Sequence, residues 1–292
     1  MTLRNFILAA CLGLAPLSVP HVGFADTTLA PQSSQSADSA RIAALTDTLM
    51  MGQVMSVMRD EGLDYGHTLE TEMFAGRGGD RLPVVDGGIY DPDEMRRRFD
   101  AALGLELAVA GVDLGKIEAF FGSAQGQRIL TLEIDARRAL LDAGVEDAAK
   151  LAWSDMGDKN PGRADLIRQF VQANDLVESN VMGALNANLA FYRGMAESDS
   201  FPEEMTEEQM LQDVWDQEPD IRAETESWLY PYLALAYEPL ADSDLETYIA
   251  FSESPAGKRM NAALFAAFDV VFTQISADLG AAAARQMQGE DI

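Results

Sequence analysis

The sequence contains one short motif twice at a fixed spacing, and this repeat constrains the fold more than any other feature. The residues SPAGKR at 254–259 are preceded, 131 positions earlier, by SAQGQR at 123–128. Over 17 aligned positions that start at Asp113 and at Asp244, seven residues are identical. Because a match at a fixed offset indicates a duplicated unit, we predict two related halves. The repeat concerns architecture and implies no chemistry.

Each copy of the motif predicts a short helix, a sharp corner and a long helix. In the second copy, Ser243 and Glu246 have the spacing of a capping box, which marks a helix start. Ser254 is typical of the next N-cap, and Pro255 fits the first helical position, where its missing N–H costs nothing. Gly257 then falls in the first turn. Glycine is a weak helix former, so we expect the preceding helix to approach closely at this corner.

The second copy resembles the signature of an exported bacterial family called "domain of unknown function 2059", whose helical members carry a Phe-Tyr-x-Ser-Pro-x-Gly segment. The similarity covers residues 225–285 and rests on Asp244-Leu245, Phe251 and Ser254-Pro255-x-Gly257-Lys258. Ser252 replaces the tyrosine that is usual in the family, and the first copy is degenerate because Ala124 replaces the proline. The resemblance implies an exported helical fold and no particular reaction.

Residues 1–25 have the pattern of a secretory signal peptide. Arg4 supplies the positive start, and Phe6–Val19 is an uncharged, largely apolar run. Small residues precede a cleavage site between Ala25 and Asp26. The run is too short for an ordinary transmembrane helix. We therefore expect a periplasmic or secreted protein with no transmembrane helix in the mature chain.

Cleavage would remove the only cysteine, Cys11, and leave one histidine, His67. Disulfides and thiol chemistry are then excluded, and a two-histidine zinc site is disfavoured. The segment Leu8–Cys11 resembles a lipobox. However, the apolar run continues past the cysteine, which argues against lipoprotein anchoring at Cys11.

The chain is strongly acidic, with a formal net charge of −27 at pH 7. A field of this sign repels nucleic acid and anionic membrane surfaces and favours solubility. We therefore expect no nucleic-acid partner. An unknown protein or a small molecule stays open as the partner.

The remaining pattern predicts an all-α fold, because no stretch alternates as a sheet would require. Its main helices are expected at 39–61, 123–153, 161–178, 179–197, 220–237 and 255–287. The predicted segments are a flexible leader (26–38), a first helical unit (39–153), a linker (154–163), a second helical unit (164–287) and a disordered tail (288–292).

Two groups of side chains with metal-binding chemistry occur in the first unit. Met51, Met55 and Met58 share one helix face, and thioethers can bind copper(I). Methionine also fills irregular cores, and core packing is the preferred interpretation. His67, with Glu70 and Glu72, is interpreted as surface.

Residues 62–91 are interpreted as irregular, and the acidic stretch 64–94 offers carboxylates for a cation or for hydrolysis. Asp80, Asp86 and Asp91 belong to it, but the spacing of an EF-hand loop is missing. Asp91 with Pro92 is better explained as a helix start.

A band of aromatic residues is expected on the helix at 220–237, where it could line a ligand groove or form a seam between helices. Its members are Trp228, Tyr230, Tyr232 and Tyr237. No catalytic, cofactor-binding or metal-binding residue is assigned. We expect an exported, non-catalytic helical binding or structural module of the cell envelope. The alternative is a hydrolase that uses the acidic stretch with carboxylates or a divalent metal.

Overall fold

The computed structural model describes residues 32–74, 88–108, 112–196 and 206–288. Every regular element within these ranges is an α-helix, which confirms the predicted all-α class. The predicted signal peptide, its cleavage site and residues 289–292 lie outside the described residues.

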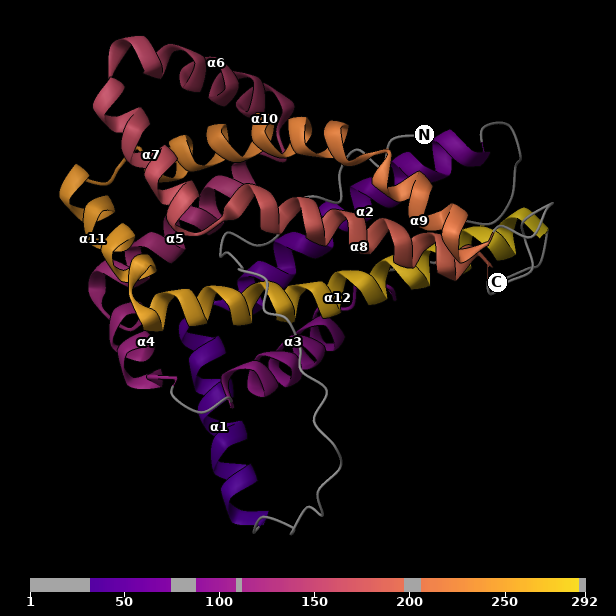
Figure 1. Cartoon of the computed structure of the whole chain (residues 1–292), viewed down its shortest axis with the longest axis horizontal. Coiled ribbons are helices and arrows are strands. Elements are labelled where there is room, and N and C mark those ends of the chain that lie inside the picture. Colours follow the sequence, from indigo (N-terminus) through magenta and orange to yellow (C-terminus); the bar gives the residue numbers. More distant parts are fainter. Residues whose placement is uncertain (1–31, 75–87, 109–111, 197–205, 289–292) are drawn as a thin grey trace.

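Twelve helices are described (Figure 1). The first half contains α1 (Gln32–Thr48), α2 (Met51–Phe74), α3 (Pro92–Leu107), α4 (Leu114–Phe121), α5 (Ala124–Ala139) and α6 (Ala143–Lys159). The second half contains α7 (Pro161–Ala173), α8 (Leu176–Ala196), α9 (Glu207–Trp215), α10 (Glu218–Tyr237), α11 (Asp242–Glu253) and α12 (Pro255–Gln288).

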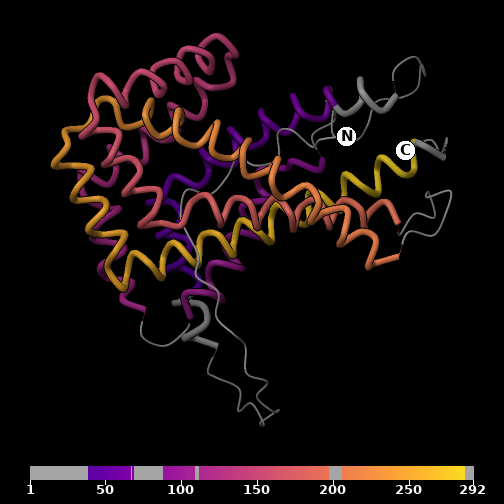
Figure 2. The backbone as a smooth tube through the Cα atoms, turned by 45° about the horizontal axis from the view of Figure 1, so that its top comes forward, coloured from indigo at the N-terminus to yellow at the C-terminus, as the bar shows by residue number. Residues whose placement is uncertain are grey.

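The long helix α12 runs through the centre of the fold. It packs along α8, against α3, and near its start against α11 and α4 (Figures 1 and 2). The core cluster around it takes side chains from both halves, among them Leu45, Phe99, Phe121, Tyr237 and Leu264. The two predicted units therefore share one core.

Among the described helices, α12 alone is long and apolar enough to cross a membrane, over Pro255–Gln286. Half of its most apolar window is buried inside the protein. A helix that is apolar on most sides is also what the centre of a large core requires. The composition of α12 thus fits its place in the core, and the lack of a membrane span stays a prediction.

Two glycines bring the backbones of α8 and α12 into direct contact. A Cβ atom on Gly194 would overlap the carbonyl oxygen of Ala277, and one on Gly280 would overlap that of Phe191. Only glycine permits such an approach between two helices. The α8–α12 contact therefore depends on these two positions.

The two predicted corners have the same local geometry. The Oγ atoms of Ser123 and Ser254 accept hydrogen bonds from the backbone N–H of Gly126 (3.0 Å) and Gly257 (3.1 Å). A Cβ atom on either glycine would overlap the last turn of the preceding helix. These contacts confirm the predicted serine caps and the predicted close approach at both glycines.

The two halves also contact each other reciprocally. The rings of Phe120 and Phe251, which occupy matching places before their corners, stack with centroids 4.0 Å apart and 6° between their planes. In addition, α5 packs on α10 while α12 packs on α3. Arg128 donates to the carbonyl of Pro239, and Arg259 donates to that of Glu106. Reciprocity of this kind is typical of two related units around a two-fold axis. Duplication of the whole unit stays a prediction.

Two helices that were expected to be continuous are broken. The helix predicted at 39–61 is split at Met50, whose φ of 57° is left-handed. The helix predicted at 123–153 ends at Ala139, and α6 folds back onto α10 and α7. Asp142 caps the new helix by accepting from the N–H groups of Gly144 and Val145. This cap stabilises a restart that the continuous apolar pattern concealed.

Four further boundaries were wrong. Residues 32–38, which were predicted as part of the flexible leader, belong to α1. Residues 154–159 complete α6 and are not a linker. Asn160 caps α7, because its side-chain oxygen accepts from the N–H of Arg163. Residues 62–74 continue α2 and are not irregular. Ser243 does not cap a helix, because α11 begins at Asp242 without a side-chain cap.

Substitutions at the second corner are expected to destabilise the protein. Ser254→Ala should lower the free energy of unfolding by about 1 kcal/mol through the lost cap. Gly257→Leu should lower it by about 1–3 kcal/mol, because the side chain would overlap α11. Gly162→Leu is the matched control, since Gly162 also lies in a first turn but has open space. Urea unfolding measures all three, and equal effects at Gly257 and Gly162 would contradict the packing role.

Candidate functional site

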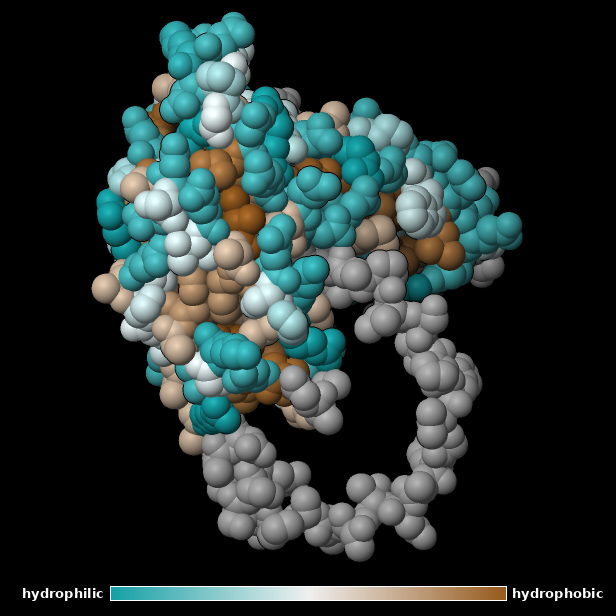
Figure 3. Space-filling model, turned by 60° about the vertical axis from the view of Figure 1, so that its left-hand side comes forward, coloured by the Kyte–Doolittle hydropathy of each residue, from teal (hydrophilic) through white to brown (hydrophobic). Residues whose placement is uncertain are grey.

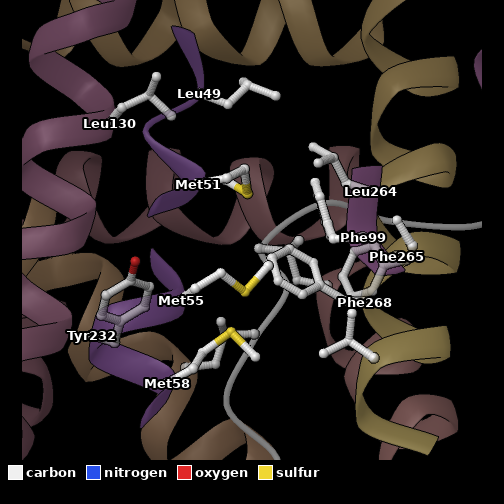
Figure 4. Close-up of a cluster of buried hydrophobic side chains, with 14 of the residues drawn as sticks. Leu49, Met51, Met55, Met58, Phe99, Leu130, Tyr232, Leu264, Phe265 and Phe268 are labelled. Atoms are coloured by element: carbon white, nitrogen blue, oxygen red, sulfur yellow. The ribbon is translucent and has the colours of Figure 1, made fainter. Parts of the chain in front are cut away.

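The methionine face of α2 is part of the core. The exposed fractions of Met51, Met55 and Met58 are 6%, 0% and 2%. Figure 4 shows their sulfur atoms pointing into a cluster that contains Phe99 and Phe268. A copper(I) site would need sulfurs that the solvent can reach, so this hypothesis is wrong and core packing is confirmed.

The acidic stretch is only partly described. Asp91 is the N-cap of α3, and its Oδ1 accepts from the N–H groups of Asp93 (2.9 Å) and Glu94 (3.0 Å). Asp80 and Asp86 lie outside the described residues, as do the side chains of His67, Glu70 and Glu72. In the part of the chain that the structure describes, no group of three or more His, Cys, Asp or Glu side chains could hold a metal ion.

The aromatic band of α10 forms the predicted seam. Trp228 stacks on Tyr232 at 4.6 Å, and Tyr230 stacks on Trp153 of α6 at 5.0 Å. Tyr237 is fully buried. One member, Tyr230, also reaches the surface, where it lines a pocket beside α7.

Two adjoining pockets lie along the exposed face of α7, and they share Gln172. The first has a volume of about 300 Å³, and the second has a volume of about 340 Å³. The first pocket is lined by Arg168, Val171, Gln172, Asp175, Leu176, Val177, Glu178 and Tyr230. The second pocket is lined by Gln169, Gln172, Ala173, Glu253 and Lys258. We call the pair the α7 trough.

The turn between α7 and α8 shapes the first pocket. The chain reverses at Asp175, which has a left-handed φ of 49°. Aspartate is among the residues that tolerate this conformation best. The buried Asn174 holds the turn, because its Nδ2 donates to the carbonyl of Phe170 and its Oδ1 accepts from Asn261 of α12. The position of Asp175 in the trough is therefore fixed by the core.

The charges around the first pocket differ in how they are compensated. Arg168 pairs with Asp165 at 2.8 Å and lies over the ring of Trp153. Arg222 pairs with Glu178, which lowers the pKa of that carboxyl. Burial, followed by the charge of Glu178, raises the pKa of Asp175. Asp175 forms no ion pair with another described residue, so its negative charge is available to a ligand.

The second pocket lies at the corner between α11 and α12 and also contains charged side chains. Glu253 and Lys258 flank the Ser254 cap, and neither is paired with another described residue. Gln169 lines this pocket as well, and Gln172 lines both pockets. The trough thus offers uncompensated charges of both signs around two groups that can donate and accept hydrogen bonds.

Sequence reasoning missed the trough as a site. In the sequence, Lys258 stands out only as part of the motif, and Tyr230 only as part of the aromatic band. The face of the molecule on the α7 and α11 side shows hydrophilic residues with patches of hydrophobic residues among them (Figure 3). The side chains that line the trough come from separate segments of the chain, so no single stretch of sequence marks it.

No family model, no curated protein and no solved structure matches this chain. The resemblance of residues 225–285 to the exported helical family therefore stays a prediction that rests on the motif residues themselves.

Proposed function

We propose that this protein is an exported, non-catalytic helical binding module of the cell envelope and that the α7 trough is its binding site. The observation that carries the proposal is the pair of adjoining pockets with unpaired charges of both signs. Export is supported by the predicted signal peptide at 1–25. The alternative hydrolase gains no support among the described residues, because Asp91 is already used as a helix cap.

The chemistry of the trough favours a short peptide as the ligand. The amides of Gln169 and Gln172 can pair with peptide N–H and C=O groups. Lys258 can bind a terminal carboxylate, and Asp175 can bind a terminal ammonium group. Pockets of this size lie at the lower end of the range for small-molecule sites. A ligand that spans both pockets would bury more surface than one that occupies either alone.

Filling the centre of the trough is expected to abolish this binding. Gln172→Trp would place a large ring where the pockets meet, so the affinity for unmodified tripeptides should fall at least about tenfold, which is about 1.4 kcal/mol of binding free energy. Isothermal titration with a set of tripeptides of varied side chains measures the effect. The matched control is Gln53→Trp on the exposed face of α2.

Two results would contradict the proposal. One is that no tripeptide binds the wild-type protein at millimolar concentration. The other is that Gln172→Trp and Gln53→Trp bind the same peptide as well as the wild type does. In the second case the protein would still bind peptides, but through another surface.

A further inference from the structure

A carboxyl group lies inside the contact between the two halves. Glu133 of α5 accepts a hydrogen bond from the hydroxyl of Tyr237 of α10 at 2.7 Å, and it accepts another from the hydroxyl of Tyr248 of α11. The hydroxyl of Tyr232 donates to the backbone carbonyl of Glu133 at 3.2 Å. Three tyrosines of the second half therefore converge on one residue of the first half.

Burial dominates the electrostatics of this carboxyl group. Glu133 keeps only part of its surface exposed, and close packing around the carboxyl raises its pKa from 4.5 to about 7. The hydroxyls of Tyr237 and Tyr248 act in the opposite direction, because they stabilise the carboxylate. Two neutral donors thus offset only part of the cost of a buried charge.

The fold does not require a carboxyl group at this place. Glu133 lies ten residues after the capping Ser123, and the residue ten positions after Ser254 is Leu264. Tyr248 lies six residues before Ser254, and the matching residue before Ser123 is Ile117. Leu264 and Ile117 are apolar and almost fully buried, with exposed fractions of 1% and 0%. The same helix position is therefore occupied by an apolar core residue in the second half.

The charged groups that neighbouring helices bring to this region are already paired. Arg137, one turn further along α5, binds both carboxylate oxygens of Glu61 of α2. Arg163 of α7 binds Asp242 of α11 and the backbone carbonyl of Tyr237. On α4, Glu118 pairs with Arg41 of α1. Among the described residues, the groups shown to act on the carboxyl of Glu133 are the hydroxyls of Tyr237 and Tyr248. These hydroxyls stay neutral in this pH range.

We propose that Glu133 makes the contact between α5 and the α10–α11 pair respond to pH: the protonated carboxyl keeps the contact closed, and the carboxylate loosens it. The neutral form needs little contact with water, and both tyrosines keep their hydrogen bonds to it. Glu133 is only partly exposed. The charged form gains free energy from further contact with water, and more water reaches it when α5 separates slightly from α10 and α11. The two halves are then closed below neutral pH and looser above it.

Hydrogen exchange of the full chain tests this proposal, with exposure times scaled for the faster chemical exchange at pH 8 than at pH 6. In the wild type, backbone amides of α10 and α11 should exchange at least about tenfold faster at pH 8 than the scaled rate at pH 6, since one pKa unit corresponds to a factor of ten. Glu133→Gln should show the same slow scaled rate at both pH values. Glu246→Gln, on the exposed face of α11, is the control and should behave as the wild type does.

A second variant separates proton linkage from a merely structural role. Tyr248→Phe removes a donor that lowers the pKa of Glu133, so the midpoint of the exchange transition should move to higher pH. A structural defect would speed up exchange without moving this midpoint. The proposal is overturned if the scaled rates of the wild type do not change with pH. It is also overturned if Glu133→Gln keeps the change or if Tyr248→Phe leaves the midpoint where it was.

Discussion

Gly194→Ala is expected to lower the free energy of unfolding by about 2–3 kcal/mol, although alanine is the better helix former. The added methyl group would overlap the carbonyl of Ala277 on α12. Backbone atoms cannot turn away as a flexible side chain can, so α8 and α12 would have to move apart. Because α12 is the central helix, this separation would disturb packing along much of the core.

The same helix supplies a control with the opposite expected sign. Gly183 also lies in α8, but a Cβ atom there would meet no atom within 4 Å. Gly183→Ala should therefore stabilise the protein by about 0.5–1 kcal/mol, which is the ordinary gain of alanine over glycine in a helix. Urea unfolding of both variants and of the wild type measures the difference. Two changes of the same sign would show that Gly194 is not a contact residue.

Glu133→Gln is expected to raise the free energy of unfolding by about 3 kcal/mol at pH 8 and to change it little at pH 5. The folded protein raises the pKa of Glu133 to about 7, whereas the unfolded chain leaves it near 4.5. Between these values the folded state holds a proton that the unfolded state has lost, so stability falls as the pH rises. The difference in pKa corresponds to about 3 kcal/mol, and this loss is complete above pH 7.

The difference between the two proteins isolates this titration from the many other acids of the chain. Urea unfolding of wild type and Glu133→Gln at several pH values from 5 to 8.5 gives the difference directly. It should grow from about zero to its full size across pH 5–7 and then stay constant. A difference that is flat with pH, or one that grows toward acid, would contradict a raised pKa at Glu133.

Local chemistry by itself determined several helix starts and the two glycine corners. Asp91, Ser123 and Ser254 cap helices where the sequence predicts caps. A cap involves a side chain and a backbone N–H two or three residues away, so its signal lies within a few residues. The two glycine corners were predictable from local sequence as well. Glycine is a weak helix former, so its presence in the first turn of a helix indicates that another backbone approaches closely there.

Tertiary packing decided the breaks inside helices. The apolar pattern runs on through Leu140 and Leu141, yet α5 ends there and Leu141 is 47% exposed. Helix propensity changes little at such a point. The break allows α6 to fold back and pack on α10 and α7. The free energy of this packing depends on distant residues, so no local sequence pattern predicts the break.

The functional features were also set by long-range contacts. Glu133 lies in the segment Thr131-Leu-Glu-Ile134, where nothing distinguishes it from the many exposed acids of the chain. Its burial depends on Tyr237 and Tyr248, which lie more than 100 residues away. The α7 trough likewise joins α7 and the α7–α8 turn to Tyr230 and to the corner at Lys258. A pKa and a pocket depend on which groups surround a site, so the sequence could predict the helices but not these two features.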